Sequence, residues 1–125
     1  LGVKLASPDR SVVCISGDGS AMWSIQSLWT AAHYNIPVTY IICANSIYRQ
    51  VRIMKNRIMG PRAKGRYLGT DISGPQIDFC GLARSLGIPG VRVEKPGDLR
   101  GALKAAFNSG RLNLIEVAVD GSLPD

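Results

Sequence analysis

The residues with the clearest chemical potential form the stretch GDGS at positions 17–20, which directly follows an apolar run. Asp18 provides a carboxylate and Ser20 a hydroxyl group, and apolar residues at helical spacing come next. The first N–H groups of a helix lack internal partners and carry a partial positive charge, so this junction suits an anion such as phosphate. Because the Asp18 carboxylate would repel that anion, a cation between the two is the simplest way to join them.

A second polar group is Asn45, which follows the apolar run at residues 38–44. The two apolar runs read as strands and the segment between them as a helix, which makes a βαβ unit with parallel strands. Ligands bind beyond the carboxyl ends of such strands, and this unit puts Asp18 and Asn45 at the same edge of the sheet. Carboxylate and amide oxygens suit Mg²⁺ or Ca²⁺, and protein-bound Mg²⁺ often also contacts phosphate oxygens. We therefore expect a metal-bridged diphosphate at this edge.

Two other interpretations of the glycine-rich stretch stay open at this point. A Gly-Asp-Gly sequence is by itself a common turn. A G-x-G motif between a strand and a helix also occurs in dinucleotide-binding proteins, but Met22 or Trp23 stands where their third glycine belongs. The sequence also has no Walker lysine after the loop. The position of Asn45, one βαβ unit later, is what favours the metal site.

The apolar pattern of the whole chain predicts an α/β protein. Short apolar runs typical of buried strands lie at residues 11–16, 38–44, 91–94 and 112–119. Helical spacing occurs at residues 20–34, 46–59, 78–86 and 98–109, and residues 1–6 read as the end of a further helix. This alternation predicts an open, mostly parallel sheet with helices on both faces. Residues 60–75 are rich in Gly, Pro and basic residues and predict a long loop, a type of segment that often covers a site.

Length and composition predict a single globular domain. The chain has 125 residues, of which 46% are hydrophobic, and this length is too short for two domains. No apolar run is long enough for a membrane span, so we expect no membrane contact. The three cysteines, Cys14, Cys43 and Cys80, lack the spacing of a disulfide framework or a zinc site. We expect them to be buried thiols in a reducing compartment, which predicts a cytoplasmic protein.

The net charge of +6 comes from one segment. Residues 49–66 contain seven of the 15 Lys and Arg residues and no acidic residue. This run fits a solvated helix face, and it also fits an anionic substrate, a coenzyme tail or a partner chain. We expect no nucleic-acid binding, because the segment has only Tyr48 and Tyr67 near it as stacking residues and carries no recognised nucleic-acid motif.

The stretch GDGSAMWSIQSLWTAAHYNIPVTYIICANSIY resembles the cofactor motif of the thiamine diphosphate-dependent enzymes, which begins with GDG and ends in Asn. The segments PQIDFCGLARSLGIPGVRVEKPGDL and LIEVAVD are also similar to this family. The similarity is strongest to the benzoylformate decarboxylase-like 2-keto acid decarboxylases, and acetolactate synthases and pyruvate decarboxylases match less well. Thiamine diphosphate and Mg²⁺ are therefore the implied cofactors.

The resemblance implies a role for each residue of the motif. Metal ligands would be the Asp18 carboxylate, the Asn45 side chain and the backbone carbonyl of Ile47. The diphosphate would contact Gly19 and Ser20, and Tyr48 would lie close to the cofactor. Two residues of the following helix, Val51 and Met54, would line the substrate pocket, although ordinary core packing explains them equally well.

Two positions depart from the usual pattern of the family. Ala44 replaces the first residue of the usual Asn pair, which is not the main metal ligand, so we expect metal binding to be retained. Ile47 is bulky where the family often has Gly or Thr. A ligand that uses its backbone carbonyl depends little on its side chain. The basic run after Tyr48 also differs from benzoylformate decarboxylase, which leaves the identity of the substrate open.

The resemblance further implies that residues 1–125 are most of one domain, the C-terminal pyrophosphate-binding domain, truncated at its first strand. In this family the activating glutamate belongs to an N-terminal pyrimidine-binding domain of another subunit, and the acid–base histidines lie upstream. We therefore expect a homo-oligomer, a dimer or tetramer, that acts on a small 2-keto acid. We expect no catalytic residue within these 125 residues, no activity from them alone, and marginal solubility.

Several functions stay open besides a 2-keto acid decarboxylase. One is an acetolactate synthase-like carboligase, and another is a thiamine enzyme that handles an acyl-coenzyme A. Outside enzyme catalysis, the chain fits a non-catalytic α/β binding module. It also fits a degenerate subunit that assembles with an active partner.

Overall fold

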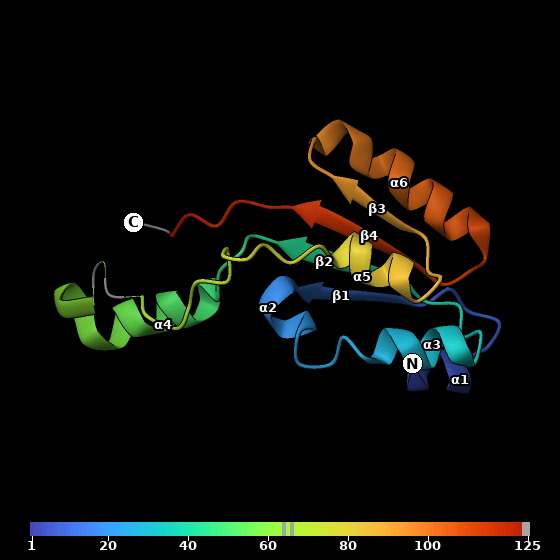
Figure 1. Cartoon of the computed structure of the whole chain (residues 1–125), viewed down its shortest axis with the longest axis horizontal. Helices are drawn as coiled ribbons and strands as arrows, with labels where there is room; N and C mark the ends of the chain where they lie inside the picture. The colour runs from blue at the N-terminus through green and yellow to red at the C-terminus, as the bar shows by residue number, and fades with distance from the viewer. Residues whose placement is uncertain (64, 66, 124–125) are drawn as a thin grey trace.

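The computed structural model describes the chain apart from residues 64, 66 and 124–125 (Figure 1). A four-stranded sheet with the strand order β1-β2-β4-β3 forms its centre. The strands are β1 (Val13–Gly17), β2 (Thr39–Ala44), β3 (Gly90–Val93) and β4 (Asn113–Ala118). All three strand pairs are parallel, so the carboxyl ends of the strands meet at one edge of the sheet. The predicted open, parallel α/β fold is confirmed.

Six α-helices and one short 3₁₀ helix accompany the sheet in the described part of the chain. They are α1 (Gly2–Ala6), α2 (Asp18–Ala21), α3 (Ser27–His33), α4 (Arg49–Met59), η1 (Gly60–Ala63), α5 (Phe79–Ser85) and α6 (Pro96–Ser109). Each crossover between parallel strands contains at least one of these helices. This is the connection that parallel strands require.

The helices cover both faces of the sheet, as predicted. On one face, Tyr40, Ile42 and Leu114 form a buried core with side chains of α3 and α5. Successive strand residues point to opposite faces, so Asn113 points away from that core. Its side-chain Nδ2 donates to the backbone carbonyl of Ala106 in α6 at 3.2 Å. α6 therefore lies over the second face (Figure 1).

Two predicted helices begin where their residues have suitable local chemistry. The helix predicted at residues 78–86 is α5, and the Asp78 carboxylate caps it by accepting the Gly81 N–H at 2.6 Å. The helix predicted at residues 98–109 is α6 and begins earlier, at Pro96. Proline suits the first turn of a helix, because its φ is already near the helical value and its missing N–H has no partner there.

The prediction of one continuous helix at residues 20–34 is wrong. α2 begins earlier, at Asp18, and ends at Ala21, and α3 begins only at Ser27. Between them the backbone bonds span three residues, as from the Trp23 N–H to the Ser20 carbonyl. The Trp23 and Met22 side chains are exposed, so of the apolar residues in this segment only Ile25 packs against the core, and tertiary packing gives a regular helix little support here.

The prediction that all three cysteines are buried is also wrong. Cys80 is buried, Cys43 is half-buried and Cys14 is exposed. Within the described chain β1 pairs only with β2, so its other edge is open. Ile15 in β1 is also exposed, at 70%. The apolar run predicts a strand with covered faces, but the described chain provides no element to cover this strand.

α4 extends away from the sheet beyond its carboxyl edge (Figure 1). The helix predicted at residues 46–59 starts only at Arg49. Ser46 adopts a left-handed conformation with φ of 59°, and Ile47 forms an antiparallel bridge with Asp71, so neither residue is helical. Among the described residues, none of the helices combines the length and the apolar character that crossing a bilayer requires.

Candidate functional site

The Asp18 carboxylate joins the carboxyl ends of the adjacent strands β1 and β2. Asp18 Oδ2 accepts the backbone N–H groups of Asn45 at 2.8 Å and Ser46 at 2.5 Å. Asp18 Oδ1 accepts the N–H group of Gly19 at 2.8 Å. The residue is only 4% exposed, and these three donors offset the cost of burying its carboxylate. The structure therefore brings Asp18 and Asn45 together at one edge of the sheet.

The turn after β2 contains a further side-chain hydrogen bond next to this carboxylate. The Asn45 side-chain Oδ1 accepts the Ile47 N–H at 3.2 Å, which holds the amide over its own turn. Ser46 lies in the left-handed region, which residues other than glycine rarely adopt. Tyr48 then forms the N-cap position of α4. The turn at residues 45–48 is thus held by local bonds and by Asp18.

A cavity of about 230 Å³ lies between this turn and the start of α2. All six residues that the sequence predicts for the cofactor and the metal line it: Asp18, Gly19, Ser20, Asn45, Ile47 and Tyr48. The predicted metal donors are a carboxylate, an amide oxygen and a backbone carbonyl. These are hard oxygen ligands, and among the described lining residues none carries a thiol or an imidazole. The donor set therefore fits Mg²⁺ better than a softer metal.

The Tyr48 ring lies directly against Gly19 at the wall of the cavity. A Cβ atom at Gly19 would stand 2.5 Å from Tyr48 Cε1 and 2.8 Å from Cδ1, closer than any side chain can pack. A larger residue at this position would therefore force the Tyr48 ring or the backbone of α2 to move. The contact also fixes the first turn of α2 relative to the start of α4.

Sequence reasoning missed a segment that pairs with the turn after β2, at residues 70–72. The Tyr48 N–H donates to the Thr70 carbonyl at 2.9 Å, and the Ile72 N–H donates to the Ser46 carbonyl at 2.9 Å. These bonds pair the segment with the turn after β2 like a short antiparallel strand. Part of the predicted loop at residues 60–75 is therefore fixed to the site.

Arg52 connects this segment to α4. Its Nε donates to Thr70 Oγ1 at 2.9 Å, and its Nη2 lies 3.6 Å from Asp71 Oδ2. The pKa of Asp71 is lowered, chiefly by hydrogen bonds from the Ser73 hydroxyl and backbone N–H, with a smaller contribution from Arg52. No local sequence signal predicts these contacts, because the partners are far apart in the chain and the loop has no periodic pattern.

The two predicted substrate-pocket residues occupy different places. Val51 lines the cavity, and Met54, one turn further along α4, does not belong to its wall. Both side chains are about half exposed, so neither is an ordinary core residue within the described chain. Their contact with a substrate stays a prediction. The single histidine, His33, stacks on Trp29 at 4.8 Å within α3 and is not part of the cavity wall.

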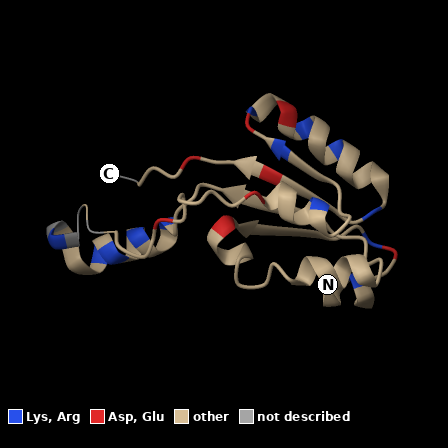
Figure 2. Ribbon diagram, in the orientation of Figure 1, with Lys and Arg blue, Asp and Glu red and all other residues tan. Residues whose placement is uncertain are grey.

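Some residues of the basic run at residues 49–66 have structural roles. Figure 2 shows basic residues along the ribbon of α4. Arg49 Nε donates to the Ser122 carbonyl at 2.8 Å, so this residue links α4 to the C-terminal segment. Arg52 points to residues 70–71, as described above. Lys64 and Arg66 belong to the same run but lie outside the described residues.

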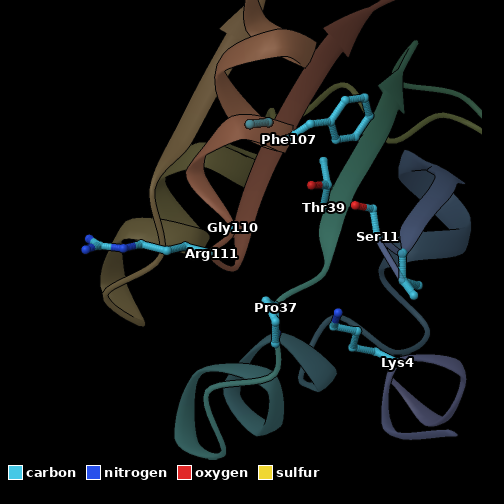
Figure 3. A pocket seen from close by; sticks show the side chains of 9 residues that line it. Lys4, Ser11, Pro37, Thr39, Phe107, Gly110 and Arg111 are labelled. Atoms are coloured by element: carbon cyan, nitrogen blue, oxygen red, sulfur yellow. The ribbon is translucent and has the colours of Figure 1, made fainter. Parts of the chain in front are cut away.

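A smaller cavity of about 70 Å³ lies near the amino ends of the strands, away from the Asp18 site (Figure 3). Its wall includes Lys4, Ser11 and Thr39. The Lys4 ammonium donates to the backbone carbonyls of Pro8 and Arg10 at 2.6 and 2.7 Å. This charge therefore holds the segment before β1 in place.

Comparison with known proteins identifies the family. Residues 1–117 match the family described as thiamine pyrophosphate enzyme, C-terminal TPP binding domain. The chain is 38% identical to benzoylformate decarboxylase from Pseudomonas aeruginosa, over 94% of this chain and 21% of that protein. It is also 38% identical to the acetolactate synthase large subunit from Haemophilus influenzae, over 98% of this chain and 21% of that protein.

A solved structure agrees with these sequence matches. The thiamine diphosphate-dependent 4-hydroxybenzoylformate decarboxylase of Rhodococcus jostii RHA1 superimposes with a TM-score of 0.85 at 40% identity. The match covers 95% of this chain and 21% of that one, so the chain spans about a fifth of the length of these relatives. The chain belongs to the thiamine pyrophosphate enzyme family, and residues 1–117 match its C-terminal TPP-binding domain.

Proposed function

We propose that the turn at residues 45–48 and the start of α2 bind the diphosphate of thiamine diphosphate through a Mg²⁺ ion. The metal ligands are the Asp18 carboxylate, the Asn45 amide oxygen and the Ile47 carbonyl. The diphosphate lies against Gly19 and Ser20, and Tyr48 forms the adjoining wall. The observation that carries this proposal is that one cavity is lined by all of these residues, including the buried Asp18.

In this proposal, residues 1–125 contribute to the reaction by binding and orienting the cofactor. Thiamine diphosphate, when bound, supplies an electron sink for cleaving or forming a bond beside a 2-keto group. The buried Asp18 carboxylate is already fixed by three backbone donors, so it needs little rearrangement to bind a cation. The cation in turn lets the diphosphate lie beside a carboxylate that would otherwise repel it.

The whole protein acts, in this proposal, as a cytoplasmic 2-keto acid decarboxylase. Support comes from the two benzoylformate-type decarboxylases among its relatives, at 38% and 40% identity. Residues 1–125 form one domain of a homo-oligomer, a dimer or tetramer. Other domains of the protein, including a pyrimidine-binding domain of another subunit, supply the activating glutamate and the acid–base groups. Val51 and Met54 of α4 contact the substrate.

A carboligase is the second candidate, because an acetolactate synthase matches at the same 38% identity. The products distinguish the two reactions. A decarboxylase converts benzoylformate to benzaldehyde and CO₂, whereas an acetolactate synthase joins two molecules of pyruvate after one loses CO₂. An acyl-coenzyme A substrate is a third possibility that the basic residues of α4 favour. Incubation of the full-length protein with each substrate, followed by product analysis, separates the three.

Calorimetry of the full-length protein tests cofactor binding. We expect thiamine diphosphate to bind only in the presence of Mg²⁺, and Asn45→Ala to weaken binding strongly. Asn45→Ala is informative because, among the described residues, the Asn45 side chain accepts a hydrogen bond only from the nearby Ile47 N–H, so its loss should disturb the fold little. Asp18→Ala should show no binding of thiamine diphosphate, whether or not Mg²⁺ is present. Asp9→Ala removes an exposed carboxylate outside the cavity and serves as the control.

Two results would overturn the proposal. If thiamine diphosphate binds equally well with and without Mg²⁺, and Asn45→Ala does not change its affinity, the proposed metal site is wrong. Absence of binding in a folded full-length protein would instead favour a degenerate subunit or a non-catalytic binding module.

A further inference from the structure

We propose that Arg52 is a positioning residue for the metal site: it holds residues 70–72 against the turn at residues 45–48 and so sets the direction of the Ile47 carbonyl. This inference rests on the proposed function, because the Ile47 carbonyl is a metal ligand only there. Arg52 does not line the cavity itself. Its effect on the metal therefore passes through the paired segment.

The backbone on both sides of Ile47 is held by residues 70–72. On one side the Ser46 carbonyl accepts the Ile72 N–H at 2.9 Å, and on the other the Tyr48 N–H donates to the Thr70 carbonyl at 2.9 Å. Ile47 itself is bridged to Asp71. The Ile47 carbonyl shares a peptide group with the Tyr48 N–H, and the preceding peptide group is held through the Ser46 carbonyl. The Ile47 carbonyl can therefore rotate only if this pairing opens.

The Arg52 guanidinium holds the same segment through two donors. Nε donates to Thr70 Oγ1 at 2.9 Å, and Nη2 donates to the Thr70 carbonyl at 3.2 Å, the same carbonyl that pairs with Tyr48. The Arg52 side chain is 13% exposed and Thr70 is buried, so these bonds are shielded from water. The ion pair with the largely exposed Asp71 contributes less, since solvent screens exposed pairs.

The position of Arg52 is itself fixed by α4 and by Tyr67. The Arg52 N–H donates to the Tyr48 carbonyl at 3.1 Å, so the guanidinium belongs to the turn of the helix that begins at the metal-binding turn. Its Cζ lies 4.8 Å from the centroid of the Tyr67 ring. The Thr70 hydroxyl donates to the Tyr67 carbonyl at 2.6 Å. These contacts suit a planar fork of donors, which lysine cannot reproduce.

A direct role in binding an anionic substrate is the competing explanation, because Arg52 belongs to the basic run. Two observations argue against it. Nε and Nη2 both donate into the protein, towards Thr70, and Asp71 lies beside the guanidinium. A lysine would retain most of a purely electrostatic attraction for an anion, whereas it would lose the two-donor contact with Thr70. The Arg52→Lys variant therefore distinguishes the two roles.

The test measures the dissociation constant of Mn²⁺ from the full-length protein in the presence of thiamine diphosphate. We expect Arg52→Ala to weaken Mn²⁺ binding by roughly 10-fold or more, the effect of losing a residue that orients a ligand. Arg52→Lys should recover only a small part of this loss. Arg57→Ala removes an exposed positive charge from the same helix and should change the constant by no more than about twofold.

Hydrogen exchange provides a readout that does not depend on the metal. The Tyr48 amide, bonded to Thr70, should exchange faster in Arg52→Ala than in the wild-type protein and be unchanged in Arg57→Ala. Thr70→Val removes the hydroxyl acceptor while preserving shape, and should weaken Mn²⁺ binding in the same direction as Arg52→Ala. This variant decides the question if Arg52→Ala does not fold.

The outcomes separate this inference from the proposed function. If the wild-type protein binds Mn²⁺ and thiamine diphosphate but Arg52→Ala and Thr70→Val bind Mn²⁺ equally well, the positioning role is wrong and the proposed function stands. Full recovery in Arg52→Lys would also overturn it, because charge alone would then suffice. If the folded wild-type protein binds no metal, the proposed function fails and the inference fails with it.

Discussion

Asp18 and Asn45 are joined by a hydrogen bond of 2.8 Å from the Asn45 N–H to Asp18 Oδ2, although they follow different strands. The bond closes the carboxyl edge of the sheet between β1 and β2, which pair in parallel up to Gly17 and Cys43. One carboxylate thereby organises the turn that carries the other two predicted metal ligands. The structure and the binding site consequently depend on the same side chain.

Replacement of Gly19 tests the contact between α2 and the start of α4. In Gly19→Ala the new Cβ would lie 2.5 Å from the Tyr48 ring, so the ring or the helix must move. We expect a loss of about 1–3 kcal/mol in stability, typical of overpacking, and weaker binding of thiamine diphosphate. Native-state hydrogen exchange of α2 and calorimetry measure these effects.

Gly17→Ala is the matched control, because no atom lies within 4 Å of a Cβ at that position. The double variant Gly19→Ala/Tyr48→Ala should be no less stable than Tyr48→Ala alone, since the ring that causes the clash is gone. Equal effects of Gly19→Ala and Gly17→Ala would contradict the steric explanation.

Loss of Arg92 should destabilise the contact between β3 and β4, where Arg92 pairs with the buried Glu116. Glu116 is only 1% exposed, and its Oε1 accepts Arg92 Nη1 at 2.5 Å. Arg92→Ala leaves this carboxylate without its cation. Because the Arg92 side chain is itself 37% exposed, we expect a loss of about 1–3 kcal/mol in stability, the cost of leaving a buried acceptor unsatisfied, rather than that of breaking a fully buried ion pair. Hydrogen exchange of the β4 amides measures the change in the full-length protein.

A neighbouring pair provides the control for this prediction. Arg92 Nε also contacts Glu94 at 3.0 Å, but Glu94 is largely exposed, so Glu94→Gln should cost less than about 1 kcal/mol. Adding Glu116→Gln to Arg92→Ala should recover part of the loss, because the unpaired charge is removed. A similar cost for Arg92→Ala and Glu94→Gln would show that burial of Glu116 is not the cause.

The Cys80 thiol should make the stability of the folded protein depend on pH in the alkaline range. Burial raises the pKa of Cys80, and the negative charges of Glu116 and Asp78 raise it further. The pKa of Cys80 is therefore higher in the folded than in the unfolded protein. The stability that comes from keeping this thiol neutral is fully present below the unfolded pKa and is lost as pH rises through the folded pKa. Thermal unfolding above about pH 9 should therefore depend on pH less steeply in Cys80→Ala than in the wild type. An equal slope in the two proteins would contradict the assignment to Cys80, and Cys14→Ala serves as the control.

The isolated chain of residues 1–125 should self-associate. β1 has an open edge, and the Ile15 side chain on it is 70% exposed, a combination that favours pairing with another sheet. Sedimentation should show oligomers that Ile15→Lys reduces, whereas Ile58→Lys on the exposed part of α4 should leave them unchanged. A monomeric wild-type chain with one cooperative unfolding transition would refute this prediction.

Much of the fold follows from local sequence patterns. Short apolar runs predict the four strands, and the βαβ rule places Asp18 and Asn45 at one edge. These predictions succeed because strand hydrophobicity depends on neighbouring residues, and because parallel strands joined by a crossover helix bring their carboxyl ends to one edge. The helix predicted at residues 20–34 fails because the apolar spacing continues through a segment in which Trp23 points into solvent.

The candidate site is held by long-range contacts that no local sequence pattern predicts. Arg52 bonds to Thr70, which is 18 residues later in the chain, and the segment between them includes a loop without periodicity. The left-handed Ser46 also gives no sequence signal, because glycine or asparagine is the usual residue for that conformation. The exposure of Cys14 likewise depends on which elements neighbour β1, and a strand's own residues do not encode this.

The most direct test of the metal site is a crystal structure of the full-length protein with thiamine diphosphate and Mn²⁺, with the cation located by its anomalous scattering. The account predicts one anomalous peak within about 2.2 Å of a carboxylate oxygen of Asp18, Asn45 Oδ1 and the Ile47 carbonyl, in contact with the diphosphate. A bound diphosphate with no cation beside Asp18, or a peak away from these three oxygens, would contradict it.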